Sequence, residues 1–329
     1  MKEPACVDPR QSWQKLAFRL LRGLVFLAVL IAIGHRVWIE RERLAAYDFG
    51  LDYRWIGVSG FCYLIGMSAC ALFWWVAMRD CRASPNGLSV ATAYFAGHLG
   101  KYVPGKGLVV VIRAAVVKGP GVTIGIAAMT CFIETLLMMA TGSLLSLLSL
   151  PFLQVQHRSY LILISAGLTA VLGLLVSPPV VSRLKTIATK PFPGVARDFE
   201  CRVRWITLGN GIVLMWAAWF LAGLSLAGLL ASMGQLGLVA AQLGIIKAYA
   251  LMVCVVALAT VGGFVSMVPG GLGMREWILV ETLGPIIGGS QAIVAAILLR
   301  LVWLVAEILA TGVLWLVYIQ WKKRALLPG

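Results

Sequence analysis

Acidic side chains are scarce in this sequence, and histidine is scarcer still. Only 13 of its 329 residues are Asp or Glu and three are His, against 28 Lys or Arg. Charged residues make up 12% of the chain, whereas hydrophobic residues make up 60%. Such a chain cannot be a soluble domain with one core. Its excess of positive charge therefore indicates loop topology and attraction to anionic lipid headgroups, and not nucleic acid.

Motifs that would mark an enzyme or a bound cofactor are also missing. The chain has no D-x-D pair, no cluster of His and Asp, and no phosphate-binding G-x-x-x-x-G-K-[ST] loop. Its seven cysteines are scattered without a C-x-x-C pair, so we interpret them as small apolar residues and not as a disulfide frame or a zinc site. We therefore expect no metal, no cofactor, no use of ATP and no enzymatic activity.

Seven apolar runs are each about long enough to cross the hydrocarbon core as a helix. They are residues 23–38, 56–78, 122–150, 160–177, 205–230, 244–268 and 292–318. We interpret the first run as a retained span and not as a cleaved signal peptide, because a long charged segment precedes it. The sequence thus predicts an all-α polytopic membrane protein. Residues 1–329 would form a single integral membrane domain with about seven to eight transmembrane helices.

The distribution of positive charge predicts the side of the membrane that each loop faces. Basic residues crowd residues 2–22 and the central loop over residues 183–204, whereas residues 234–243 carry no charge. The positive-inside rule places the N-terminus and the central loop in the cytoplasm, in a multi-pass protein of the cell inner (plasma) membrane. The basic residues 322–324 place the C-terminus there as well. Seven crossings cannot satisfy both ends, so either a broken segment hides an eighth crossing or one assignment is wrong.

The stretch G-K-Y-V-P-G-K-G, residues 100–107, interrupts an apolar segment with glycine, proline and two lysines. A helix over residues 88–103 would be too short to span comfortably and would stop at Pro104-Gly105, and a second short helix would follow over residues 108–118. We expect a re-entrant hairpin whose two ends lie on one side of the membrane. Non-helical backbone at membrane depth is tolerated only against protein or water, so the break predicts a cavity.

A related stretch, S-M-V-P-G-G-L-G-M-R-E-W, occupies residues 266–277. Both stretches read V-P-G followed by more glycine, and Arg113 and Arg275 each lie on the helix expected after the break. Paired interruptions in corresponding halves of a membrane chain indicate a transporter's binding site. They predict an internal repeat with halves of about residues 20–180 and 200–320.

The first break has the chemistry of a phosphate site. A helix starting near Gly107 presents its free N–H groups and the positive end of its dipole to the break. Lys106 lies at this end, and Arg113 is seven residues further on the same face. Lys101 and His98 line the preceding helix. The alternative is that the lysines extend to the interface and Arg113 pairs with a carboxylate, which would give the segment its orientation only.

Carboxylates within apolar spans are costly and usually face a partner or a water-filled path. Glu134 lies in the middle of a predicted span, and Glu307 lies seven residues after Arg300 on one face of the last helix. Three roles stay open for both carboxylates. They are counter-ions to Arg113 or Lys101, members of a proton relay, or receptors for a cationic headgroup.

The predicted substrate site gathers both breaks and these charged residues. Glu276, in the first turn after Gly273, either caps its helix or joins the site. The predicted substrate-binding residues are His98, Lys101, Tyr102, Pro104, Gly105, Lys106, Gly107, Arg113, Glu134, Pro269, Gly270, Gly271, Gly273, Arg275, Glu276, Arg300 and Glu307. No catalytic or metal-binding residue is predicted.

Together, these motifs resemble a known family. G-K-Y-V-P-G-K with Arg113 downstream, Glu134 in mid-span, and V-P-G-G-L-G-M-R-E with a late Arg300 are similar to the integral membrane family of the lysylphosphatidylglycerol synthase transmembrane region, also described as flippase-like. The resemblance runs over about residues 18–318. It implies kinship with the membrane half of the multiple peptide resistance factor, whose flippase half moves aminoacylated phosphatidylglycerol between leaflets. Other members are associated with polyprenyl-linked glycan or hopanoid pathways.

The chain also departs from the bifunctional members of that family. Their soluble acyltransferase-like domain transfers the amino acid, and no such domain follows the last predicted span here. The resemblance therefore implies the lipid-moving half without the synthase half.

The leading hypothesis is a lipid flippase that moves an anionic phospholipid, or a polyprenyl- or aminoacyl-linked lipid, with its phosphate at the basic break. One alternative is a membrane transferase acting on a lipid phosphate, although the chain lacks the carboxylate pair or metal-ligand cluster that it would need. The other alternative is a non-transporting partner of a lipid-modifying enzyme. Expected partners are membrane lipids, with such an enzyme or a second copy of the chain as further candidates, and not nucleic acid.

Overall fold

A computed structural model describes residues 50–102, 107–153, 158–189, 204–266, 268, 271 and 273–325. Within these ranges every regular element is helical, and six helices are long and apolar enough to cross a membrane. They are α3 (Tyr53–Asp80), α6 (Ile124–Ser149), α7 (Arg158–Val176), α10 (Trp205–Ser232), α12 (Ile245–Val265) and α14 (Gly289–Ala325). Each matches one predicted apolar run, and the remaining run, residues 23–38, lies outside the described residues. The prediction of an all-α polytopic membrane protein is confirmed.

Shorter helices connect these spans. They are α4 (Gly87–Leu99), the 3-10 helix η1 (Gly100–Tyr102), α5 (Gly107–Val116), the 3-10 helix η2 (Leu150–Phe152), α8 (Pro178–Thr189), α11 (Leu236–Leu243) and α13 (Met274–Ile287). Four of them, namely α4, η1, α5 and α13, flank the two predicted breaks. The breaks are therefore built into the fold as interruptions between separate helices.

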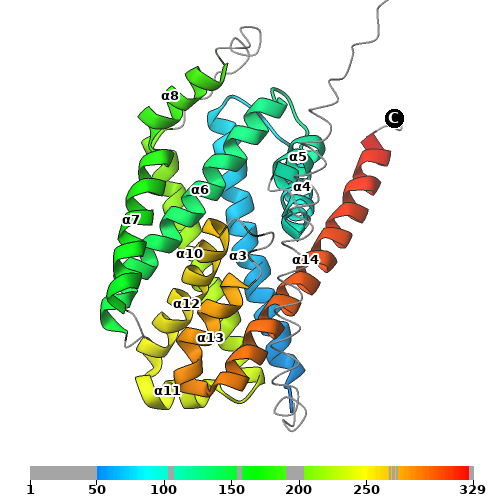
Figure 1. The fold of residues 1–329 in the computed structure, drawn as a ribbon. Coiled ribbons are helices and arrows are strands. Elements are labelled where there is room, and N and C mark those ends of the chain that lie inside the picture. The colour runs from blue at the N-terminus through cyan, green and yellow to red at the C-terminus, as the bar shows by residue number, and fades with distance from the viewer. Residues whose placement is uncertain are drawn as a thin grey trace, which may run out of the picture.

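Helices α3 and α10 pack against each other along their lengths and run in opposite directions (Figure 1). The Asp52 N–H, just before α3, donates to the Ser232 carbonyl at the end of α10, with an N···O distance of 3.1 Å. At the other end, Arg204 Nη2 lies 3.1 Å from Asp80 Oδ1. These contacts join the start of each helix to the end of the other. Helices α6 and α14 each pack against both members of this antiparallel pair.

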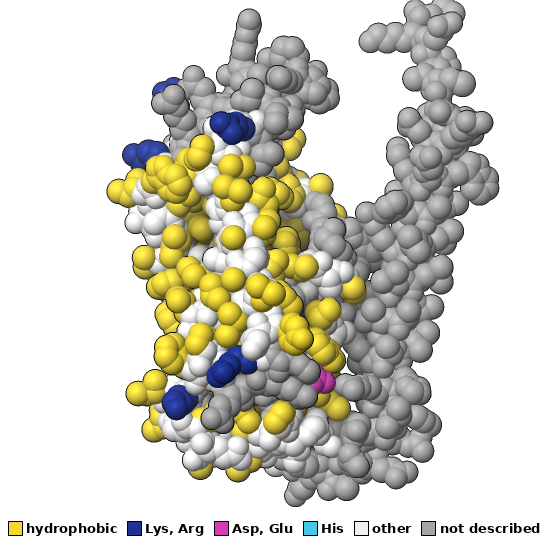
Figure 2. Space-filling view, turned by 60° about the vertical axis from the view of Figure 1, so that its left-hand side comes forward, with side chains coloured by type: hydrophobic (Ala, Val, Ile, Leu, Met, Phe, Trp, Pro, Cys, Tyr) yellow, Lys and Arg dark blue, Asp and Glu magenta, His cyan; other side chains and the backbone are white. Residues whose placement is uncertain are grey.

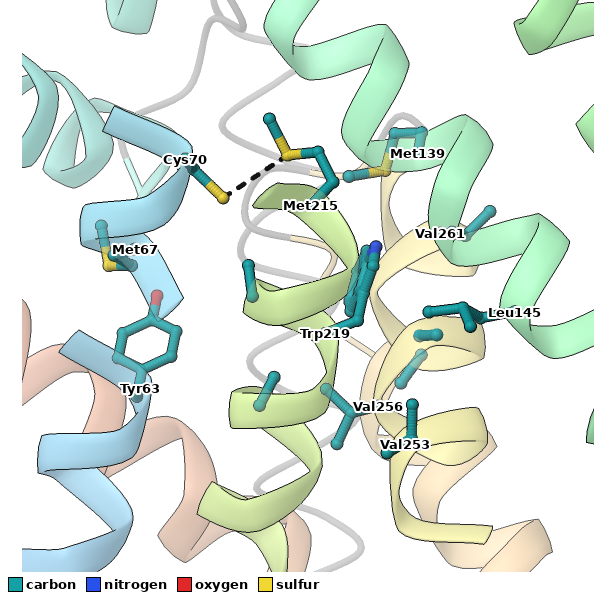
Figure 3. Packing of buried hydrophobic residues seen from close by; sticks show 14 of the residues in the cluster. Tyr63, Met67, Cys70, Met139, Leu145, Met215, Trp219, Val253, Val256 and Val261 are labelled. Carbon is teal, nitrogen blue, oxygen red and sulfur yellow. Dashed lines mark hydrogen bonds between the residues drawn. The ribbon is translucent and has the colours of Figure 1, made fainter. Parts of the chain in front are cut away.

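The apolar core fills the space between α3, α6, α10 and α12 (Figure 3). Trp219 of α10 lies fully inside it, and its indole N–H donates to Thr141 Oγ1 of α6 over 3.2 Å. A Cβ atom at Gly142 would lie 2.6 Å from the Trp219 ring, so the glycine makes room for the indole. Because the buried tryptophan has a hydrogen-bond acceptor, its polar atom is satisfied within the core.

Most of the described cysteines fit the interpretation made from the sequence, but one does not. Cys62, Cys70, Cys131 and Cys254 are free, and the last three are buried. Cys70 packs among apolar side chains, with its Sγ 3.6 Å from the Met215 Sδ (Figure 3). Cys81 is disulfide-bonded, so its interpretation as an unpaired residue is wrong. The spacing of cysteines does not reveal which distant residues the fold brings together.

The outer surface carries a broad band of hydrophobic side chains, with Lys and Arg near its upper and lower margins (Figure 2). Helix α7 contributes exposed apolar residues along its length, including Tyr160, Leu163, Ile164, Val171 and Leu174. A soluble protein rarely exposes so large an apolar surface. The band is typical of a surface that faces lipid, with charged residues where headgroups and water begin.

The first break lies at the tip of a helical hairpin made of α4 and α5, which we call the first hairpin. Asn86 N–H donates to the Lys118 carbonyl over 3.0 Å, which joins the start of α4 to the chain just after α5. A Cβ atom at Gly100 would lie 3.2 Å from the Val109 nitrogen, so the two helices remain close towards the tip. The predicted start of the second helix at Gly107 is confirmed. The tip itself, residues 103–106, lies outside the described residues, as therefore do Pro104, Gly105 and Lys106.

Candidate functional site

The second break separates α12 from α13, and these two helices form what we call the second hairpin. Gly271 and Gly273 have φ angles of 67° and 84°, in the left-handed region that glycine adopts at little cost. The Gly273 N–H donates to Glu276 Oε2 over 2.7 Å, so Glu276 caps α13, as one of the two predicted roles stated. Pro269 and Gly270 lie outside the described residues.

Arg275 is placed in the first turn of α13 and lies against two neighbouring glycines, one on α12 and one in the second break. A Cβ atom at Gly263 of α12 would lie 2.7 Å from the Arg275 Nε, and a Cβ at Gly271 would lie 2.8 Å from it. These glycines leave room for the guanidinium. Its Nε is buried without a hydrogen-bond acceptor, and among the described residues no carboxylate lies within ion-pair distance of Arg275.

Glu307 of α14 is fully buried and collects donors from two other elements. Its Oε1 atom lies 2.5 Å from Lys101 Nζ of η1 and accepts a hydrogen bond from the Tyr63 hydroxyl of α3. The Tyr63 ring stacks on Trp303 with their centroids 4.4 Å apart, which fixes the direction of the hydroxyl. The second oxygen, Oε2, is buried and has no hydrogen-bond partner. Glu307 is thus confirmed as a counter-ion to Lys101, and one of its acceptor sites stays unused.

Arg300 of α14 completes this group by pairing with Glu276. We call the group the polar cluster, and its members are Tyr63, His98, Lys101, Arg275, Glu276, Arg300 and Glu307. Its charged members are the three cations of Lys101, Arg275 and Arg300 and the two carboxylates of Glu276 and Glu307. Among these described residues, three positive charges stand against two negative charges.

The arginine of the first hairpin has a different environment. Arg113 Nη1 lies 2.8 Å from Glu134 Oε2 of α6, and the two residues are 2% and 3% exposed. The Arg113 guanidinium also lies 3.9 Å from the centroid of the Tyr94 ring, while the Tyr94 hydroxyl donates to Glu134 Oε1 over 2.9 Å. A Cβ atom at Gly97 of α4 would lie 2.5 Å from the Arg113 Cγ, so here too the arginine needs a glycine beneath it. Glu134 is confirmed as the counter-ion of Arg113.

His98 lies between the two arginine environments. Its ring stacks on Tyr94 with centroids 5.8 Å apart, and its Nε2 lies 3.9 Å from Glu307 Oε1. Burial lowers the pKa of His98 well below its usual range, and the cations Lys101, Arg113 and Arg275 lower that pKa further. His98 therefore lies beside the charged residues of both arginine environments.

Burial and a neighbouring carboxylate act on the pKa of Lys101 in opposite directions. Burial lowers the pKa of Lys101, and Glu307 acts in the opposite direction because its negative charge favours the protonated amine. Arg275 lowers that pKa again, which places its guanidinium within electrostatic range of η1. Lys101 of η1 and Arg275 of α13 therefore lie within electrostatic range of each other.

The structure brings together many of the residues predicted for the site. Lys101, Arg275, Glu276, Arg300 and Glu307 meet in the polar cluster, and Tyr102 lies beside it with its ring centroid 4.9 Å from Lys101 Nζ. Arg113 and Glu134 form a separate buried pair. Substrate binding by any of these residues stays a prediction.

Three aromatic residues of the site were missed from the sequence. Tyr63 and Tyr94 donate hydrogen bonds to the two buried carboxylates, and Trp303 supports Tyr63. The available signal was the hydroxyl group itself, since a buried tyrosine needs a hydrogen-bond partner. The sequence does not show which carboxylate lies opposite.

Comparison with known families identifies the chain. The family described as the lysylphosphatidylglycerol synthase TM region matches residues 21–310. The chain belongs to this family, as the resemblance of its motifs indicated. A comparison with curated proteins finds no match. Family membership and the six apolar helices together make this a multi-pass, lipid-related membrane protein.

Proposed function

We propose that this protein is a lipid flippase, which moves an anionic phospholipid, or a polyprenyl- or aminoacyl-linked lipid, between the leaflets of the cell inner membrane. In this proposal the phosphate of the headgroup contacts Arg275 within the polar cluster. The single observation that carries it is the Arg275 guanidinium, which has a buried Nε and no acceptor among the described residues.

An unpaired arginine at membrane depth is costly, because its charge has left water without gaining a counter-ion. A guanidinium offers several N–H donors in a planar fork, which matches two oxygens of one phosphate. The polar cluster has one more positive charge than negative charges among its described members. A bound anionic headgroup would supply both the missing acceptor and the missing negative charge.

The proposal assigns Arg113 a positioning role in this state. Its guanidinium is already held by Glu134 and by the face of the Tyr94 ring, at 2% exposure. A headgroup would have to displace the carboxylate to reach it, and a buried ion pair that loses one partner is strongly destabilised. Arg275 faces no such competition.

The orientation in the membrane and the partners are part of the same proposal. The first hairpin is proposed to be re-entrant, with the N-terminus and the basic central loop in the cytoplasm, because the positive-inside rule favours that arrangement. Membrane lipids are the proposed partners, and a lipid-modifying enzyme or a second copy of the chain would be further ones. The protein is proposed to transport lipid without changing it chemically.

The test is lipid translocation by the purified protein in vesicles that contain a headgroup-labelled phosphatidylglycerol. We expect Arg275→Ala to slow translocation by about tenfold or more, which corresponds to about 1.4 kcal/mol or more of lost transition-state stabilisation. The matched control is Arg183→Ala, which removes the same charge from an exposed position on α8. This control should translocate like the wild type.

Two results would contradict the proposal. Equal translocation by the wild type and Arg275→Ala would remove Arg275 from the mechanism. If the wild type is no faster than vesicles without protein, the protein is not a flippase for this lipid. Mass spectrometry of the recovered lipid completes the test, because a changed headgroup would favour the membrane transferase.

A further inference from the structure

The helices that open the two halves of the described chain run in opposite directions. Helix α3 opens the first half and α10 opens the second, and the two run antiparallel (Figure 1). In this pair, a residue before the middle of one helix contacts a residue about equally far beyond the middle of the other. Ser59 and Ser225 approach with their Oγ atoms 3.0 Å apart, and a Cβ atom at Gly66 would lie 3.1 Å from the Ala218 carbonyl oxygen.

The elements that follow α3 and α10 repeat in the same order. Apart from α11, which precedes α12 in the second half only, each half continues with a helix, a break whose sequence contains V-P-G, a short helix with an arginine, and a long helix with a buried carboxylate. In each half the arginine lies over a glycine of the helix before the break, Arg113 over Gly97 and Arg275 over Gly263. In this correspondence Glu134 of α6 is equivalent to Glu307 of α14.

The packing between halves follows the same correspondence. Helix α6 of the first half packs on α12 of the second, and α14 packs on α4 in return. Likewise, α6 contacts α10 and α14 contacts α3. The first hairpin lies towards the upper end of the molecule and α11 and α13 towards the lower end (Figure 1). This arrangement has the form of two repeats related by an axis in the membrane plane.

The symmetry fails at the arginines. Arg113 is paired with the carboxylate of its own half, Glu134. Arg275 is not paired with its equivalent, Glu307, which holds Lys101 and Tyr63 with one oxygen and leaves Oε2 without a partner. In an inverted repeat, such an asymmetry is what distinguishes the state open to one side from the state open to the other.

We propose that the chain is an inverted repeat in which Arg113 and Arg275 exchange roles between two states. In the second state Arg275 pairs with Glu307, Lys101 is released from Glu307, and Arg113 leaves Glu134. Arg113 then becomes the cation without a carboxylate, as Arg275 is here. This inference rests on the proposed function and deepens it, because an anionic headgroup would be bound by Arg275 in one state and by Arg113 in the other.

The route between the two arginines is short. His98 lies within electrostatic range of Lys101, Arg113 and Arg275. The His98 ring stacks on the Tyr94 ring. The Arg113 guanidinium also contacts Tyr94, 3.9 Å from its ring centroid. An anion that moves from one arginine to the other would thus pass His98.

A natural cysteine reports on the exchange. Cys131 is free and 1% exposed, and its Sγ lies 3.3 Å from Arg113 Nη1, so departure of Arg113 would uncover it. Cys254 is equally buried at 1% exposure but lies in α12, away from Arg113. Modification of the purified protein by N-ethylmaleimide, mapped to each cysteine by mass spectrometry, therefore separates the exchange from unfolding.

The deciding variants are Glu134→Gln alone and together with Arg275→Gln. The single change removes the charge that holds Arg113 but leaves an oxygen to accept from Tyr94, so we expect Cys131 to react about tenfold faster, with Cys254 unchanged. The double variant also removes the Arg275–Glu307 pair of the second state. We expect Cys131 to return to near its wild-type rate.

Each outcome decides the inference. If the double variant reacts as fast as Glu134→Gln, then Arg113 has merely loosened locally, and the exchange is overturned. If Cys254 also becomes reactive, Glu134→Gln has unfolded. Tyr94→Phe then replaces it, because this change removes only the hydrogen bond to Glu134 and weakens the site less. If Tyr94→Phe with Arg275→Gln reacts at Cys131 as fast as Tyr94→Phe alone, the exchange is overturned. If the wild-type protein does not translocate lipid, the proposed function is overturned instead. The two failures are distinguishable because the rates of cysteine modification do not depend on transport.

Discussion

Arg113 and Arg275 occupy similar places in the sequence, but their surroundings in the fold differ. Arg113 contacts a carboxylate, an aromatic face and a cysteine, and is almost completely buried. Arg275 lies over two glycines and has no carboxylate partner among the residues that the structure describes. The comparison teaches that a shared motif does not fix a shared role. In this structure Arg113 has a counter-ion that joins it to α6, whereas Arg275 has none among the described residues.

The largest expected effect is the loss of stability in Arg113→Ala. The change leaves the Glu134 carboxylate buried without its cation, which costs about 3–5 kcal/mol in the free energy of unfolding. Arg275→Ala leaves no carboxylate without its cation, so we expect no comparable loss of stability. Denaturant unfolding of both variants in the same detergent measures the difference.

A double variant sharpens this comparison. Replacing both members of the buried pair, Arg113→Leu with Glu134→Leu, removes the uncompensated charge and should recover much of the stability lost in Arg113→Ala. Equal destabilisation by Arg113→Ala and Arg275→Ala would show that the two arginines do not differ as described.

A smaller effect is expected at the glycine beneath Arg275. Gly263→Ala places a methyl group 2.7 Å from the Arg275 Cγ and Nε, so the guanidinium must move. Translocation of labelled phosphatidylglycerol should slow towards the rate of Arg275→Ala. We expect the free energy of unfolding to fall by only about 1 kcal/mol, because the helix preference of alanine offsets part of the cost of crowding.

The control for this glycine is Gly167→Ala on α7, where no atom lies within 4 Å of the added methyl group. It should leave translocation unchanged and stabilise the protein by up to about 1 kcal/mol. If Gly263→Ala translocates as fast as Gly167→Ala, the position of the Arg275 guanidinium does not matter for transport.

The sequence predicted the helices and the breaks well because both are local features. Apolar runs set the spans, and the glycines and prolines at residues 104–107 and 269–273 interrupt the helices. It also predicted that Arg300 and Glu307 would share a face of the last helix, and both now contribute to the polar cluster. These inferences needed only the period of a helix and the cost of charge in lipid.

The partners of each charge could not be predicted in the same way. Glu307 meets Lys101 across 206 positions of sequence, and the local pattern along a helix contains no information on such a contact. The sequence placed Glu134 and Glu307 as counter-ions to Arg113 or Lys101 without choosing between them. The choice depends on how α6 and α14 pack against the first hairpin, which is a property of the whole fold.

The most direct measurement of the central claim is native mass spectrometry of lipid bound to the purified protein in an equal mixture of phosphatidylglycerol and phosphatidylcholine. The account predicts that the wild type and Arg183→Ala retain the anionic lipid preferentially and that Arg275→Ala loses this preference. An undiminished preference for phosphatidylglycerol in Arg275→Ala would contradict it.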